Sequence, residues 1–225
     1  MTETQAVFFH GAGLSGTSWS GWGGMALDLP GHGAAPRVKV PSVESFADAL
    51  EPCLPEFMHL IGHSLGGMVA VELAARLQER VRSLVTIEAV PTVQLSRLSR
   101  LGAGLAMRLF NLIGPRGVAL LSGLGQSRKA AAHIRPQIGA MNPKGMADAL
   151  HAAFEYDARP KLNQITAPTL VLVGSDNKQT HSGARFMAHR IPNATYDVLK
   201  GGHILHVDAN DALLERLIQF HESSP

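Results

Sequence analysis

The chain has 225 residues, enough for one or two domains, and its 45% hydrophobic and 17% charged residues are typical of a globular protein rather than a disordered one. Twenty Lys and Arg against eighteen Asp and Glu give a net charge of +2, which is too small for a protein whose main partner is nucleic acid. Cys53 is the single cysteine and cannot form an internal disulfide, no apolar stretch is long enough for a membrane span, and the first residues do not resemble a signal peptide. We therefore expect a cytoplasmic protein.

Short apolar runs predict six strands, each with the length of a buried strand. They lie at residues 6–9, 25–29, 57–61, 83–87, 169–173 and 194–199. Helical patterns occur at residues 42–50, where Ser42 is the predicted N-cap, at 68–80 and at 210–221. Because strands and helices alternate, the sequence predicts an α/β fold with a mostly parallel sheet, helices on both faces, and ligand sites beyond the carboxyl ends of the strands.

Residues 92–164 interrupt this alternation, because they contain helical stretches and several proline stops but no convincing strand. We interpret them as a helical cap, or lid, between two parts of the core, residues 1–91 and 165–225. Residues 92–161 carry ten Lys and Arg against three Asp and Glu, so their net charge is +7. Leucines and arginines of residues 98–112 lie on different faces of a predicted helix. We favour a cap helix with solvated arginines over a helix that binds a membrane surface or an anion.

The strongest functional signal is GHSLGG at residues 62–67, a GxSxG motif between a predicted strand and a predicted helix. This context is what a nucleophile elbow requires, because a sharp turn there lifts the serine hydroxyl above the sheet. The glycines two residues before and after the serine keep side chains away from the strand and the helix. We therefore assign Ser64 as the nucleophile.

A serine hydroxyl is a weak nucleophile near neutral pH, so it needs a general base that is oriented by a carboxylate. His203 follows the last predicted strand, in a loop at the same sheet edge as Ser64, and is our candidate for the base. For four other histidines we prefer structural roles: His10, His32, His63 and His206. The chain lacks the paired Cys and His spacings of zinc sites and the glycine motifs of nucleotide sites, so we expect neither a metal nor an organic cofactor.

In five places the chain resembles the α/β-hydrolase superfamily, and the matches follow the order in which that family uses them. They are HGAG (10–13), DLPGHG (28–33), GHSLGG (62–67), PTLVLVGSD (168–176) and GGHILHVD (201–208). The resemblance implies the α/β-hydrolase fold, with the cap inserted after the strand that follows the nucleophile helix. It also implies that the backbone N–H groups of Ala12 and Leu65 form the oxyanion hole.

The resemblance leaves the acid of the triad open. In many relatives the carboxylate lies three residues after the glycine that ends the PTLVLVG-like strand, and this chain has Asn177 there, one position after Asp176. Other members place the acid after the strand that follows the nucleophile helix, where this chain has Glu88. We favour Asp176, with Glu88 as the alternative and a missing or unusual acid as the third case. Asp28 occupies a position that is usually structural.

The resemblance also implies that this member is truncated, because the family's first hairpin and one helix after the first motif have no counterpart. A sheet edge or apolar surface left uncovered in this way can be covered by a second copy, so a homodimer is our hypothesis.

Ser64, His203 and a carboxylate together predict a carboxylesterase-like serine hydrolase that cleaves an ester of a small molecule through an acyl-enzyme. Apolar side chains in residues 101–124 favour an apolar acyl group. Two alternatives stay open: a lactonase or carbon–carbon bond hydrolase with the same triad, and a noncatalytic small-molecule receptor on the same fold. Serine at the elbow argues against dehalogenase or epoxide hydrolase chemistry.

Overall fold

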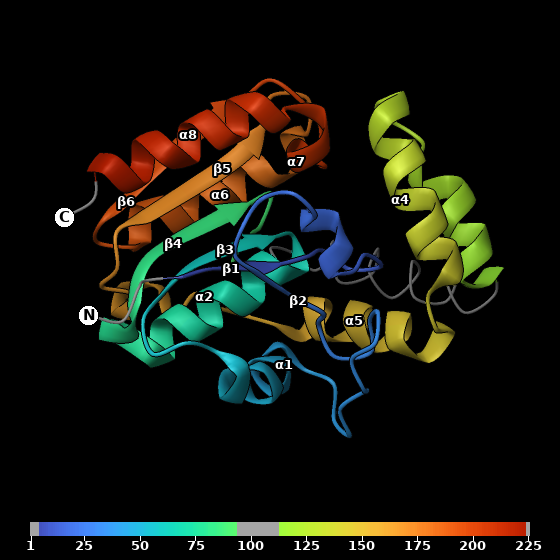
Figure 1. Cartoon of the computed structure of the whole chain (residues 1–225), viewed down its shortest axis with the longest axis horizontal. Coiled ribbons are helices and arrows are strands. Elements are labelled where there is room, and N and C mark those ends of the chain that lie inside the picture. The colour runs from blue at the N-terminus through green and yellow to red at the C-terminus, as the bar shows by residue number, and fades with distance from the viewer. Residues whose placement is uncertain (1–4, 94–112, 224–225) are drawn as a thin grey trace.

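A computed structural model describes residues 5–93 and 113–223, and within this part of the chain six strands form one sheet (Figure 1). The strands are β1 (Gln5–Phe9), β2 (Met25–Leu27), β3 (Met58–His63), β4 (Val81–Ile87), β5 (Thr169–Gly174) and β6 (Ala194–Leu199). Their order in the sheet is β2-β1-β3-β4-β5-β6, and every neighbouring pair is parallel. The predicted parallel sheet is thus confirmed.

Helices cover both faces of the sheet, as a parallel sheet requires. They are α1 (Val43–Leu50), α2 (Leu65–Leu77), α6 (Lys178–Arg190), the short α7 (Leu205–Asp208) and α8 (Asn210–Ser223). One buried cluster joins α1, α2 and α6 to one face, and a second joins α8 and Trp19 to the other. Central strands therefore have apolar side chains on both sides, which explains why they are continuous apolar runs in the sequence.

The start of α1 follows the predicted N-cap. The hydroxyl of Ser42 accepts from the N–H of Ser45 at 3.0 Å, and the hydroxyl of Ser45 accepts from the N–H of Ser42 at 3.0 Å. This reciprocal pair is a capping box, which satisfies two backbone donors that a helix terminus otherwise leaves open. The helix α6 was not predicted, although it packs against β5 and β6.

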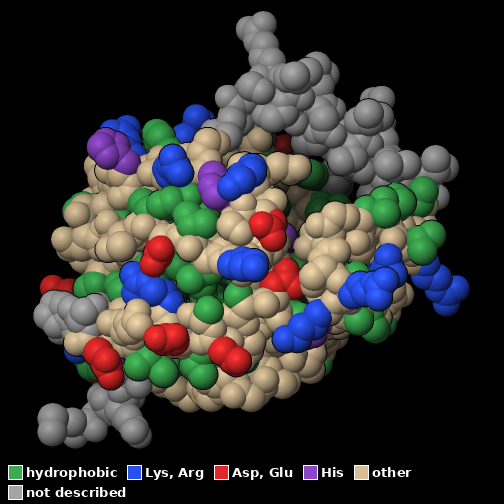
Figure 2. All heavy atoms as spheres, turned by 90° about the horizontal axis from the view of Figure 1, so that it is seen from above, with side chains coloured by type: hydrophobic (Ala, Val, Ile, Leu, Met, Phe, Trp, Pro, Cys, Tyr) green, Lys and Arg blue, Asp and Glu red, His purple; other side chains and the backbone are tan. Residues whose placement is uncertain are grey.

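Between β4 and β5 lies a helical insertion, residues 113–155, which contains a helix at residues 113–122 followed by α4 (Arg128–Ala140) and α5 (Pro143–Glu155). Figure 1 shows α4 standing beyond the carboxyl ends of the strands. Figure 2 shows Lys, Arg and hydrophobic side chains at this end of the molecule, whereas most acidic side chains in that view lie over the core. The predicted basic helix of residues 98–112 falls outside the described residues.

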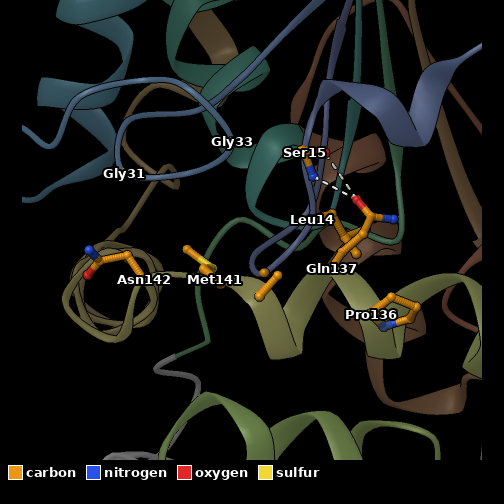
Figure 3. Close-up of a pocket in the computed structure, with 10 residues that line it drawn as sticks. Leu14, Ser15, Gly31, Gly33, Pro136, Gln137, Met141 and Asn142 are labelled. Carbon is orange, nitrogen blue, oxygen red and sulfur yellow. Dashed lines mark hydrogen bonds between the residues drawn. The ribbon is translucent and has the colours of Figure 1, made fainter.

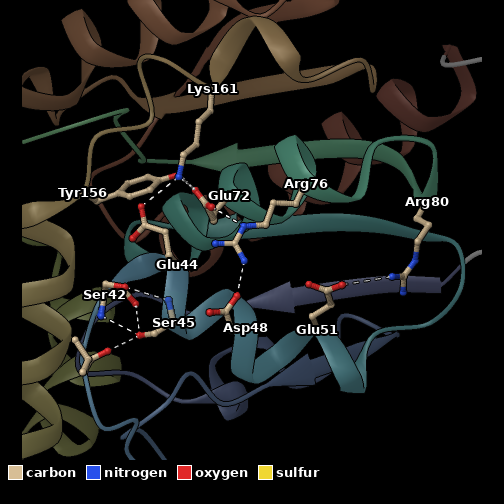
Figure 4. Close-up of polar contacts among 11 residues, drawn as sticks. Ser42, Glu44, Ser45, Asp48, Glu51, Glu72, Arg76, Arg80, Tyr156 and Lys161 are labelled. Carbon is tan, nitrogen blue, oxygen red and sulfur yellow. Dashed lines mark hydrogen bonds and ion pairs between the residues drawn. The ribbon is translucent and has the colours of Figure 1, made fainter.

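A polar cluster around Glu72 on α2 joins the core to the segment that follows α5 (Figure 4). The Glu72 side chain is 2% exposed. Its carboxylate accepts from Arg76 Nε at 2.6 Å, from Lys161 Nζ at 2.6 Å and from the Tyr156 hydroxyl at 3.0 Å. Burial, followed by the charge of Glu72, raises the pKa of Tyr156 well above its usual value, so this hydroxyl stays a donor. A buried carboxylate is tolerated only with such partners.

Tyr156→Phe is expected to lower the free energy of unfolding by about 1–2 kcal/mol, because Glu72 stays buried while one of its donors is lost. Urea denaturation at pH 7 measures this change. Tyr196→Phe is the matched control, since Tyr196 is half-buried and, among the residues that the structure describes, its hydroxyl contacts only His181 Nδ1, at 3.3 Å. Equal midpoints for the two variants would contradict a stabilising role for the Tyr156 hydroxyl.

Within the described residues, no helix combines the length and apolar character needed to cross a bilayer.

Candidate active site

The turn between β3 and α2 places Ser64 in a strained backbone conformation. Its φ is 53° and its ψ is −118°, which a residue with a side chain rarely adopts. The Ser64 N–H donates to the carbonyl of Ile87 on the neighbouring strand at 2.8 Å, which helps to hold the turn. A Cβ at Gly66 would lie 2.5 Å from the carbonyl oxygens of Phe9 and His10, so only glycine fits there. This geometry is that of a nucleophile elbow.

Ser64 and His203 line the same cavity, which has a volume of about 250 Å³. Ala12 also lines this cavity, and its apolar wall is made by Leu14, Ile134, Ile138 and Ile204. A Cβ at Gly11 would lie 3.3 Å from Ser64 Cβ, so the loop after β1 passes close to the serine. The structure thus brings the predicted nucleophile and the predicted base together, although they are far apart in the sequence.

His63 helps to hold the loop that carries His203. The Nε2 atom of His63 lies 2.9 Å from the carbonyl oxygen of His203, and His63 is 1% exposed. Burial, then the neighbouring His206 and His203, lowers the pKa of His63 well below its usual value, so its ring is neutral and donates through Nε2. The Gly202 N–H adds a second contact by donating to Asp208 Oδ2 at 3.1 Å.

Behind His203 lies the carboxylate of Glu88, at the end of β4. Glu88 Oε2 is 3.4 Å from His203 Nδ1, and the Glu88 side chain is fully buried. The same carboxylate accepts from the Gly174 N–H and, at 2.7 Å, from the Thr180 hydroxyl. Glu88 has a φ of 56°, so like Ser64 it is held in the left-handed region.

The environment of Glu88 keeps it ionised. Burial by itself raises the pKa of this carboxyl, but hydrogen bonds from His203, the Gly174 N–H and Thr180 outweigh that effect, and the net result is a lowered pKa. A permanently charged carboxylate facing Nδ1 favours the tautomer of His203 in which Nδ1 carries the proton. Its Nε2 is then free to accept a proton.

Asp176 lies at the same edge of the sheet but does not contact the imidazole of His203. It is exposed, its carboxylate accepts from the Ser175 hydroxyl at 2.8 Å, and its N–H donates to the carbonyl of Gly201 at 2.9 Å. The next residue, Asn177, points inward: its Nδ2 is 3.1 Å from His203 Nδ1 and 2.5 Å from Glu88 Oε2. The geometry therefore brings Glu88 and Asn177, and not Asp176, to the imidazole.

The two predicted oxyanion donors flank the serine from two segments. Ala12 lies in the loop after β1, and Leu65 is the first residue of α2. In the described part of the chain, neither N–H donates to a protein acceptor. Free backbone N–H groups are suited to bind a negative charge, and that of Leu65 also lies at a helix N-terminus.

The loop of Ala12 is held from the core and from the insertion. On the core side, the Gly13 N–H donates to His32 Nε2 at 3.1 Å. On the side of the insertion, Gln137 Oε1 on α4 accepts from the N–H and the hydroxyl of Ser15, both at 3.1 Å (Figure 3). The same oxygen accepts from the Ser18 hydroxyl at 3.2 Å. Gln137 was not predicted from the sequence, because nothing local distinguishes it from a surface glutamine.

Asn177 and Thr180 were also missed, although one signal was present. Asn177 stands where many relatives of the resembled family carry the acid, and an amide at that position indicates that the carboxylate comes from elsewhere. Over the described ranges, no group of three or more His, Cys, Asp and Glu side chains is arranged to hold a metal ion.

Comparison with known proteins gives consistent matches over nearly the whole chain. A family model described as the alpha/beta hydrolase family matches residues 6–216. A pimeloyl-[acyl-carrier protein] methyl ester esterase from Chromobacterium violaceum is 29% identical over 190 residues, covering 79% of this chain and 75% of that protein. One of the same name from Aromatoleum aromaticum is 28% identical and covers 86% and 88%. The structure of MenH from S. aureus superposes with a TM-score of 0.84 at 22% identity, covering 99% and 96%.

Proposed function

Because the chain belongs to the α/β-hydrolase family, we propose that it is a serine hydrolase that cleaves carboxylic esters through an acyl-enzyme. One observation carries this proposal: Ser64 and His203 line one cavity, and the buried carboxylate of Glu88 lies 3.4 Å behind the imidazole. The similarity to esterases supports hydrolysis of an ester bond as the type of reaction.

In this mechanism Glu88, rather than Asp176, is the acid of the triad. Glu88 orients His203 through Nδ1 and stabilises the imidazolium that forms when Nε2 takes the proton of Ser64. Ser64 attacks the ester carbonyl, the alcohol leaves with the proton from His203, and water releases the acyl group in the reverse sequence. The N–H groups of Ala12 and Leu65 hold the oxyanion of both tetrahedral intermediates.

Residues 92–164 act as the cap of this site. Two side chains of α4, Ile134 and Ile138, support this role because they form part of the cavity wall above Ser64. The cap therefore contributes to substrate selection, while the groups that do the chemistry come from the core.

The test is hydrolysis of p-nitrophenyl esters from acetyl to dodecanoyl, together with methyl esters, because the similar esterases are named for a methyl ester. Wild-type turnover that disappears in Ser64→Ala is the expected result. A folded wild type that hydrolyses none of these esters would contradict the proposal. Lactones and carbon–carbon substrates would then be tested, and stoichiometric binding without turnover would indicate a receptor.

Gln137→Leu is expected to lower kcat about tenfold or more with little change in KM, because the loop of Ala12 loses its acceptor on α4 while the cavity wall is unchanged. Gln137→Glu retains the acceptor oxygen and should recover most of the rate. Gln219→Leu, on the exposed side of α8, is the control for a Gln-to-Leu change. A kcat of Gln137→Leu equal to that of this control would exclude a positioning role.

A further inference from the structure

A second cavity lies beside the catalytic one, under the junction of α4 and α5 (Figure 3). Its volume is about 450 Å³, compared with about 250 Å³ for the cavity of Ser64. Leu14, Pro136, Ala140 and Met141 give it apolar walls. It is therefore large and apolar enough to hold a hydrocarbon chain.

Among the described residues, Leu14 alone lines both cavities. It lies two positions after Ala12 in the loop after β1, and its side chain is 4% exposed. It belongs to a buried cluster with Ile134 and Ile138, which line the catalytic cavity. The Leu14 side chain is thus a shared wall, with the serine on one side and the second cavity on the other.

This wall is rigid. The Leu14 N–H donates to the carbonyl of Gly11 at 3.1 Å, which closes a turn. The preceding Gly13 has a φ of +81°, and a Cβ there would lie 2.6 Å from Met146 Cε and 2.9 Å from Ile138 Cγ1. The loop therefore packs directly against the insertion, and Leu14 has little freedom to move aside.

We propose that Leu14 limits the length of the acyl group by separating the catalytic cavity from the second cavity, so that the enzyme selects short acyl chains. This inference rests on the proposed esterase function and adds the substrate class. The second cavity is a site for an apolar chain, and the acyl group can reach it only when the side chain of residue 14 is shortened. Each additional methylene that is buried there should increase kcat/KM about fourfold, until the cavity is filled.

The experiment compares kcat/KM for p-nitrophenyl decanoate with that for the butyrate in four proteins: wild type, Leu14→Ala, Met141→Trp and the double variant. Leu14→Ala is expected to raise the decanoate-to-butyrate ratio at least about tenfold. Met141→Trp alone, which fills only the second cavity, should leave the ratio near the wild-type value, and it should cancel the gain in the double variant. Leu14→Val should show the same change in smaller size, in case the alanine variant does not fold.

An unchanged ratio in both Leu14 variants would overturn the proposal, and so would a gain that persists after Met141→Trp. A wild type without esterase activity would contradict the proposed function alone. In that case the same four proteins, each also carrying Ser64→Ala, are titrated with butyrate and decanoate. A decanoate affinity that rises in Leu14→Ala and falls again in the double variant with Met141→Trp supports Leu14 as the barrier between the two cavities. Equal affinities in all four proteins exclude this role of Leu14.

Discussion

Glu88→Gln lowers kcat for a p-nitrophenyl ester by about 10³–10⁴-fold, while Asp176→Asn leaves it within about twofold of wild type; these are the results expected if Glu88 is the acid of the triad. The two substitutions remove the same charge from the same edge of the sheet. Only one of the two carboxylates lies next to the imidazole, since Glu88 Oε2 is 3.4 Å from His203 Nδ1 and Asp176 is exposed.

The large expected loss of kcat in Glu88→Gln follows from the hydrogen bonds that Glu88 makes. As a carboxylate it only accepts, from the Gly174 N–H, from Thr180 and from Asn177. A glutamine at this position also brings an N–H₂ group, and Asn177 Nδ2 already donates toward the same space. The amide cannot stabilise an imidazolium, and it favours the tautomer of His203 that has no free Nε2.

Steady-state kinetics on the three proteins decides between the two carboxylates, with urea denaturation as the check that both variants fold. A loss confined to kcat, at nearly constant KM, indicates an interaction made in the transition state. If Asp176→Asn lost as much activity as Glu88→Gln, or if Glu88→Gln kept most of the wild-type rate, the assignment of Glu88 would be wrong.

The strands and the elbow could be predicted from the sequence because their signals are local. The central strands β3, β4 and β5 are buried on both faces and therefore are apolar runs, and the elbow needs glycines on both sides of Ser64 at fixed spacing. Likewise, His203 follows a predicted strand and precedes a predicted helix. The residues that determine these elements are therefore close to one another in the sequence.

The acid could not be settled in this way, because the choice depends on contacts between segments that are far apart. Glu88 and Asp176 both follow parallel strands, β4 and β5, that pair with each other, so both are brought to the same edge. Which side chain turns inward depends on the positive φ of Glu88 and on its bonds to Gly174 and Thr180, which lie about ninety residues away in the sequence. Gln137 illustrates the same limit, since its partners Ser15 and Ser18 lie on another segment of the chain.

Acidification between about pH 6 and 4.5 is expected to lower the free energy of unfolding steeply, by at least about 4 kcal/mol per pH unit. Most of this loss comes from three of the four buried histidines: His10, His63 and His206, with exposures of 0%, 1% and 3%. His32 and His59, whose pKa values are also lowered by burial, add to it. Burial is the largest cause in each case, and it lowers the pKa of His10 and of His206 to about 3 and that of His63 well below its usual value. Neighbouring histidines lower all three further.

The sign follows from proton uptake. Above about pH 6.5 these histidines are neutral in both the folded and the unfolded chain, so they add no pH dependence. Below that value the unfolded chain binds protons at these histidines that the folded chain accepts only at lower pH, about 3 for His10 and His206, so stability falls as the pH falls. Each histidine contributes a slope of about 1.4 kcal/mol per pH unit. Between pH 6 and 4.5 this removes about 6 kcal/mol, which is a large part of the free energy of unfolding of about 5–15 kcal/mol that a domain of this kind has.

Urea denaturation from pH 7.5 to 4.5 measures the slope, and His206→Phe tests its origin. In the described part of the chain both ring nitrogens of His206 lack a hydrogen-bond partner, and its ring lies 4.6 Å from that of Trp19, so phenylalanine removes a titrating group at little cost in contacts. The slope should fall by about 1.4 kcal/mol per pH unit, with stability at pH 7 retained. His189→Gln, at an exposed position, should keep the wild-type slope. If the wild-type slope were near zero above pH 4.5, these histidines would be charged or accessible in the folded protein.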